Sequence, residues 1–175
     1  MRIPVFALLG ASILIAVIDG CARAEDDQTP AVKETWSADA FATCSACHLP
    51  DGAGIPGAFP PLRNRLADIA GLDGGRDYLI TAVSFGLMGT IEVGGLQYFG
   101  VMAGNSGAMT AEEIASALNY AVLELNDDKD AVNAINAFSA AEVSNAQSKV
   151  ATASPAAAGK LREKMLEQHG DQWPQ

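Results

Sequence analysis

The sequence CSACH, residues 44–48, is the feature that most limits what this chain can fold into. Two cysteines three positions apart, followed at once by a histidine, are typical of a zinc site, a redox-active disulfide or a covalently attached haem. Each kind of site needs different residues around the motif. The flanking sequence therefore decides between the three.

Zinc and a redox disulfide are both disfavoured. A closed zinc site needs four ligands, and beyond residue 24 the chain offers only two cysteines and two histidines: Cys44, Cys47, His48 and His169. Because Cys47 and His48 are adjacent, they cannot easily both reach one small tetrahedral ion. A thioredoxin-like disulfide would lie at the start of a helix that follows a strand. Here a short helical run precedes the motif, and the loop sequence DGAGIPGAFPPL follows it.

The haem interpretation uses every residue of the motif. Cysteines at positions i and i+3 lie on one face of a helical turn, where their thiols can add to the two vinyl groups of a haem. The next residue, His48, can then bind the iron as an axial ligand. The sequence therefore predicts one haem c, attached through Cys44 and Cys47.

The N-terminus predicts export, which agrees with a haem attached outside the bacterial cytoplasm. The apolar run IPVFALLGASILIAVI follows Arg2 and leads to the small-x-small pattern of a signal-peptidase site at 22–24. We expect a signal peptide over residues 1–24 and a periplasmic mature protein. A permanent membrane span needs about 20 apolar residues, but this run stops at Asp19, and Asp19 also fits poorly in a lipoprotein box before Cys21.

The charge of the chain limits its partners. Its 21 acidic and 11 basic residues give a formal net charge of −10, so its surface repels nucleic acid and anionic lipid. A protein that docks on it should offer a basic or neutral patch, and the encounter should weaken with salt. No acid–base pair or nucleophile constellation stands out in the sequence, so we expect an electron-transfer protein rather than an enzyme.

The pattern of apolar residues predicts helices joined by a small hairpin. Ser37 can cap a first helix that runs to about His48, and residues 74–86 predict a second helix that ends at Gly86. Alternation around Gly94 predicts a hairpin. The first helix should cross a later, more strongly marked one.

That later helix is the clearest in the sequence. Thr110 and Glu113 form a capping box, and an apolar stripe runs from position 114 to position 125. We expect this helix to pack across the first one, with Tyr120 as the aromatic residue at the crossing.

The proline-rich loop after the motif supports the proximal histidine. The sequence DGAGIPGAFPPL cannot continue a helix, and it suits a loop folded over one haem edge. A carbonyl near Pro60 or Pro61 is placed to accept the proton of the His48 ring nitrogen that does not face the iron. Such a bond raises the basicity of the ligand.

Met102 is the predicted second axial ligand. It lies in FGVMAGNSG, which we interpret as a glycine-flanked, non-helical loop whose backbone can approach a flat macrocycle. We expect Met109 to pack at the start of a helix, Met88 to lie in a turn after a helix, and Met165 to lie on a distant helix. His169 is explained by a favourable contact with the end of a helix.

The composition changes after position 126. Ser139 with Glu142 predicts another capping box, and Ser154 followed by proline predicts a final helix that runs to about Gln168. These helices are alanine-rich. They either pack across the preceding domain or only cover it with a solvent-exposed layer, or they form a docking arm for a partner enzyme.

Residues 36–126 resemble the class I monohaem cytochromes c of bacterial periplasms. The segments CSACHLPDGAGIPGAFPPL and GLQYFGVMAGNSGAMTAEEIASALNYAV carry the resemblance. It implies the all-α cytochrome c fold around one haem and a set of five site residues: Cys44 and Cys47 on the thioethers, His48 and Met102 on the iron, and Pro61 for the carbonyl that orients the histidine. Ala103 departs from the family pattern, because many relatives have proline after the ligand methionine.

The resemblance also implies a function and a division of the chain. The function is transfer of single electrons from a dehydrogenase or other respiratory donor to an oxidase or reductase, all in the periplasm. The alternatives are a haem subunit of an oxidoreductase complex, and a haem enzyme or sensor with a labile sixth ligand, which Ala103 favours. We divide the chain into a signal peptide (1–24), a linker (25–35), a cytochrome domain (36–126) and a helical extension (127–175).

Overall fold

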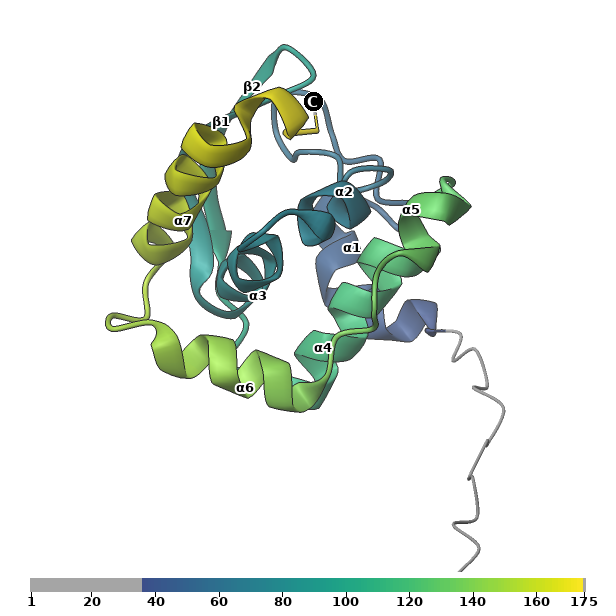
Figure 1. The fold of residues 1–175 in the computed structure, drawn as a ribbon, viewed down its shortest axis with the longest axis vertical. Helices are drawn as coiled ribbons and strands as arrows, with labels where there is room; N and C mark the ends of the chain where they lie inside the picture. Colours follow the sequence, from purple (N-terminus) through teal and green to yellow (C-terminus); the bar gives the residue numbers. More distant parts are fainter. Residues whose placement is uncertain (1–35, 175) are drawn as a thin grey trace, which may run out of the picture. The chain divides into compact units, whose positions relative to one another are not determined.

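Helices make up most of residues 36–174, the part of the chain that the computed structural model describes (Figure 1). The predicted signal peptide and the whole of the predicted linker lie outside these residues. Ser37 begins the first helical segment as predicted, because its hydroxyl accepts a hydrogen bond from the backbone N–H of Asp39 at 3.2 Å. A 3₁₀ turn, Ala38–Phe41, then continues directly into α1 (Ala42–His48).

The second and third helices lead into the hairpin. Helix α2 spans Leu66–Gly71 and α3 spans Gly75–Phe85. The predicted end of α3 at Gly86 is confirmed, and β1 (Gly86–Val93) follows it without a loop. An antiparallel partner, β2 (Leu96–Ala103), completes a two-stranded sheet.

Helix α4 (Ala111–Asn119) begins with the predicted capping box. The Thr110 hydroxyl accepts from the Glu113 N–H at 3.2 Å, and the Glu113 carboxylate accepts from the Thr110 N–H at 2.7 Å. The helix continues into a π-helical turn, Tyr120–Glu124. The Tyr120 ring lies 5.4 Å from the ring of Phe41, centre to centre, so the predicted aromatic contact with the first helical segment is confirmed.

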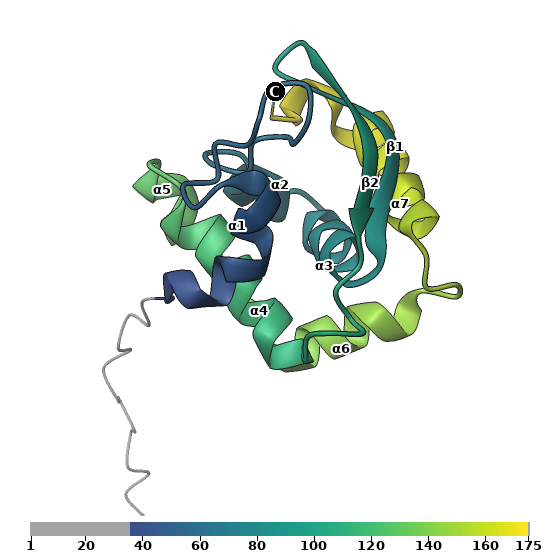
Figure 2. The ribbon, with the colours of Figure 1, turned by 180° about the vertical axis from the view of Figure 1, so that it is seen from behind.

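The C-terminal third forms three more helices, α5 (Lys129–Asn133), α6 (Ala140–Lys149) and α7 (Pro155–His169), and a final 3₁₀ turn, Gly170–Gln172. Helix α6 packs against α3 and α4, while α7 packs against α3 and β1 (Figure 2). Val143, Ala158 and Met165 of these helices are buried in the same core as Phe41. None of the helices within residues 36–174 is long and apolar enough to cross a membrane.

The second predicted capping box is only half formed. The Ser139 hydroxyl accepts from the Glu142 N–H at 3.2 Å, but the Glu142 carboxylate does not return the bond. It is held instead by Arg76 of α3, with contacts of 2.5 and 2.6 Å. An ion pair between residues distant in the sequence has replaced a local contact that the sequence pattern predicts.

Candidate haem site

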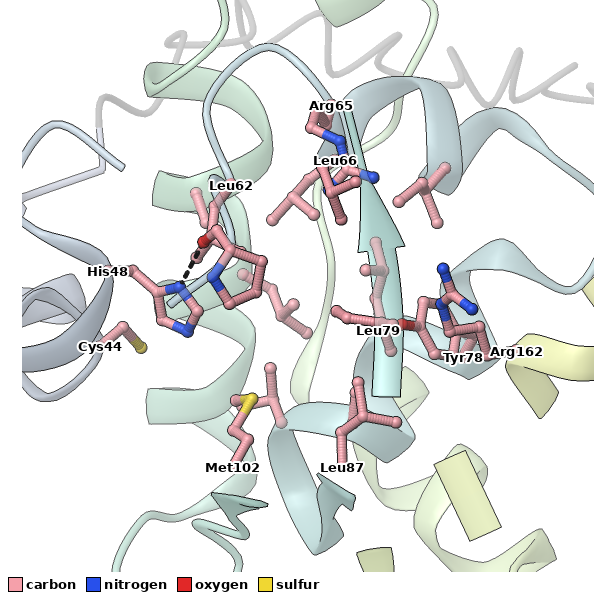
Figure 3. A pocket seen from close by; sticks show the side chains of 18 of the residues that line it. Cys44, His48, Leu62, Arg65, Leu66, Tyr78, Leu79, Leu87, Met102 and Arg162 are labelled. Carbon is pink, nitrogen blue, oxygen red and sulfur yellow. Dashed lines mark hydrogen bonds between the residues drawn. The ribbon is translucent and has the colours of Figure 1, made fainter. Parts of the chain in front are cut away.

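An apolar cavity lies among α1, the proline-rich loop, α3, the hairpin and α4 (Figure 3). It encloses about 830 Å³, part of which is open to solvent. Cys44 and His48 reach the cavity from α1, and Met102 reaches it from β2. The three predicted site residues therefore meet at one place.

The His48 imidazole is fixed by one hydrogen bond. His48 is 7% exposed, and its Nδ1 lies 2.9 Å from the carbonyl oxygen of Pro60. Because a carbonyl can only accept, Nδ1 carries the proton and Nε2 keeps its lone pair. Burial lowers the pKa of His48, an effect that the bond to Pro60 partly offsets. Burial thus favours the neutral ring, which is the form that binds a metal.

The prediction that Pro61 supplies this carbonyl is wrong. The acceptor is Pro60, and the Pro61 carbonyl instead accepts from Arg65 Nη1 at 3.2 Å. Gly54 explains the choice, because its N–H donates to the His48 carbonyl at 3.0 Å and a Cβ built on it would lie 2.7 Å from the Pro60 carbonyl carbon. The loop can fold this close to His48 only because position 54 has no side chain and a φ of +68°.

The two cysteines of the motif are free thiols on α1. Cys44 is half-buried and lines the cavity, whereas Cys47 is exposed. Burial is the main cause that raises the pKa of the Cys44 thiol. Of the two thiols, Cys44 thus faces the cavity and Cys47 is open to solvent.

Met102 lies in a strand, and the prediction of a non-helical loop is wrong. It pairs with Leu87 in the antiparallel ladder, and its half-buried side chain lines the cavity (Figure 3). Gly86 allows this arrangement, because a Cβ at that position would collide with the Met102 carbonyl oxygen. The close approach of the two strand ends thus sets the position of the thioether.

The other candidate ligands lie elsewhere. Met109 packs against the core, as predicted, and Met165 is 3% exposed within it. Met88 is 51% exposed on β1, not in a turn. His169 is the last residue of α7, and its ring Nε2 lies 3.2 Å from the carbonyl oxygen of Asp73. Among the described methionines and histidines, only His48 and Met102 line the cavity.

The residues present fit a covalently attached haem. The cavity walls are mostly apolar, the Cys44 thiol stands at one wall, and an imidazole and a thioether line the cavity. Cys47 lies three residues along the same helix and is exposed. Three further residues line the cavity without having been predicted from the sequence: Arg65 after the proline-rich loop, Arg162 on α7 and Trp173 near the C-terminus. No sequence signal connects the last two with the CSACH motif, because they follow it by more than a hundred residues.

Comparison with known proteins gives two clear relatives. No profile of a known protein family matches the chain. A protein named cytochrome c-552 from Thermus thermophilus is 41% identical over 122 residues, which cover 70% of this chain and 81% of the relative. A second cytochrome c-552 from the same species is 43% identical over 112 residues, which cover 64% of this chain and 84% of the relative. Because 122 residues exceed the length of 36–126, the first similarity extends beyond the predicted cytochrome domain.

Proposed function

This chain belongs to the cytochrome c family, and we propose that it carries single electrons with a haem whose iron is bound by His48 and Met102. The haem would be attached through Cys44 and Cys47. Its iron supplies the chemistry of the family, which is reversible cycling between Fe(II) and Fe(III). The protein's own residues bind, orient and shield that group.

One observation carries the proposal: His48 and Met102 enter the same apolar cavity from α1 and β2 (Figure 3). The bond to Pro60 supports the role of His48, because it fixes the ring orientation and raises the basicity of Nε2. A neutral thioether favours Fe(II) and so raises the reduction potential. The two side chains suit a carrier that accepts electrons from donors of lower potential.

The exposure of Cys47 supports transfer to and from other proteins. A group bonded to this exposed cysteine would have an edge at the surface, where an electron can pass to a docked partner. We propose periplasmic partners, a dehydrogenase or other respiratory donor and an oxidase or reductase as acceptor. The net charge of −10 favours partners with a basic or neutral docking patch.

The near-infrared band of methionine-ligated ferric haem tests the axial pair. We expect the purified holoprotein to show the band, the Met102→Ala variant to lose it, and the Met88→Ala variant to keep it. Met88 is the matched control, since it lies one position from Leu87 in the same hairpin and is 51% exposed. A wild-type protein that is high-spin and binds CO rapidly would contradict the proposal and favour a haem enzyme or sensor.

A further inference from the structure

Two glycines face each other across the hairpin. Gly89 of β1 pairs with Gly100 of β2 in an unbroken antiparallel ladder. Because side chains alternate between the two faces of a strand, this pair points to the same side of the hairpin as Leu87 and Met102. Both of those residues line the haem cavity (Figure 3). The glycine pair therefore lies in the cavity wall.

The wall carries no side chain at this pair. Ile91, two residues further along β1, also lines the cavity, so side chains flank the pair on both sides. Among the described residues, no atom beyond the chain neighbours lies within 4 Å of a Cβ built on Gly89 or on Gly100. Both glycines are exposed. The main chain of the hairpin is thus bare at a position where the rows beside it present apolar side chains.

Neither backbone conformation nor packing within the described chain explains a glycine at position 100. Gly89 has a φ of +109°, which favours glycine, whereas the φ of Gly100 lies outside the left-handed region. Close contact explains other glycines, such as Gly104, where a Cβ would lie 2.5 Å from the Phe85 carbonyl carbon. A glycine inside a strand often marks a place where a ligand or another backbone approaches closely. Since no described backbone approaches Gly100, a ligand is the remaining reason.

We propose that Gly89 and Gly100 form a flat seat for the haem, so that the main chain of the hairpin lies against the macrocycle beside Met102. A strand advances about 3.4 Å per residue, so Gly100 lies about 7 Å along β2 from the proposed ligand. A macrocycle centred on the iron extends over such a position, and a side chain there would hold it away from the strand. The two glycines thus let β2 come close enough for the thioether to reach the iron. This inference rests on the attached haem of the proposed function.

Filling the seat should weaken the bond between Met102 and the iron. Gly100→Ala and Gly100→Val add side chains of increasing size at a φ that both residues accept, and valine is favoured in strands. The added group should meet the haem and push it away from β2. We expect the near-infrared band of methionine-ligated ferric haem to weaken in Gly100→Ala and more so in Gly100→Val. Gly100→Val should also bind added imidazole about tenfold more tightly than the wild type, because the strain of overpacking then opposes Met102.

Gly107 provides the matched control. It lies in the turn before α4, outside the hairpin. Like Gly100, it is exposed, has a φ outside the left-handed region and has no described atom within 4 Å of a built Cβ. We expect Gly107→Ala to keep the near-infrared band and the imidazole affinity of the wild type. If Gly100→Ala and Gly100→Val also keep both, the proposal is overturned.

A measurement on the wild type decides the matter if the Gly100 variants fail to hold haem. In proton NMR spectra of the reduced holoprotein, the α protons of Gly89 and Gly100 should show nuclear Overhauser contacts with protons on the haem periphery. Contacts with protein protons only would overturn the proposal. The methionine methyl signal in the same spectra reports the sixth ligand separately, so failure of the proposed axial pair and failure of the glycine seat can be told apart.

Discussion

The shape of the loop over His48 can be tested at a single position. Gly54 is buried with a φ of +68°, and a Cβ there would displace the Pro60 carbonyl. Gly57, in the same loop, is exposed with a φ of +75° and has no atom within 4 Å of its built Cβ. Both alanine variants place a side chain on a left-handed backbone. Only Gly54→Ala also brings a Cβ against the Pro60 carbonyl, which is the hydrogen-bond acceptor of His48.

The expected magnitudes follow from these contacts. An alanine in the left-handed region costs about 1 to 2 kcal/mol, which is the whole effect of Gly57→Ala on the free energy of unfolding. Displacing the Pro60 carbonyl also leaves the buried His48 Nδ1–H without its acceptor, which costs about 1 to 3 kcal/mol more. Gly54→Ala should therefore destabilise the protein by about 2 to 5 kcal/mol.

The assay compares denaturant unfolding and reduction potential for the two holoprotein variants. Loss of the hydrogen bond makes the His48 imidazole less basic, so Fe(III) is less stabilised and the potential of Gly54→Ala should exceed that of Gly57→Ala. Equal free energies of unfolding together with equal potentials would refute the reasoning.

Two further predictions concern contacts of the C-terminal third. The buried Asn119 side chain exchanges two hydrogen bonds with the Phe138 backbone, at 2.6 and 2.9 Å, so Asn119→Ala should lower the free energy of unfolding by about 2 to 5 kcal/mol. The exposed control Asn145→Ala should change it by less than about 0.5 kcal/mol, and equal effects in denaturant titrations would contradict this. Hydrogen bonds from Arg76 lower the pKa of Glu142 below its ordinary value of 4.5, so the carboxylate stabilises the fold above that pH and less below it. Glu142→Gln should therefore have a lower denaturant midpoint than the wild type at pH 7. This difference in midpoint should shrink as the pH falls below 4.5. A difference that stays constant down to about pH 3 would rule out the ion pair as its cause.

The local features of the fold follow from the sequence alone. The CSACH motif, the cap at Ser37, the capping box of Thr110 with Glu113 and the helix end at Gly86 each depend on residues within a few positions of one another. Hydrogen bonds of this range form whenever the segment adopts its favoured backbone angles. These features were therefore predictable before any tertiary contact was known.

The tertiary structure alone decided which groups meet at the site. Pro60 and Pro61 are equivalent in sequence, and only the fold of the loop turns one carbonyl toward His48. Likewise, Arg162 enters the cavity because α7 packs along α3 and β1. Such contacts join residues far apart in the chain, so they depend on how all the intervening elements pack and not on any local preference.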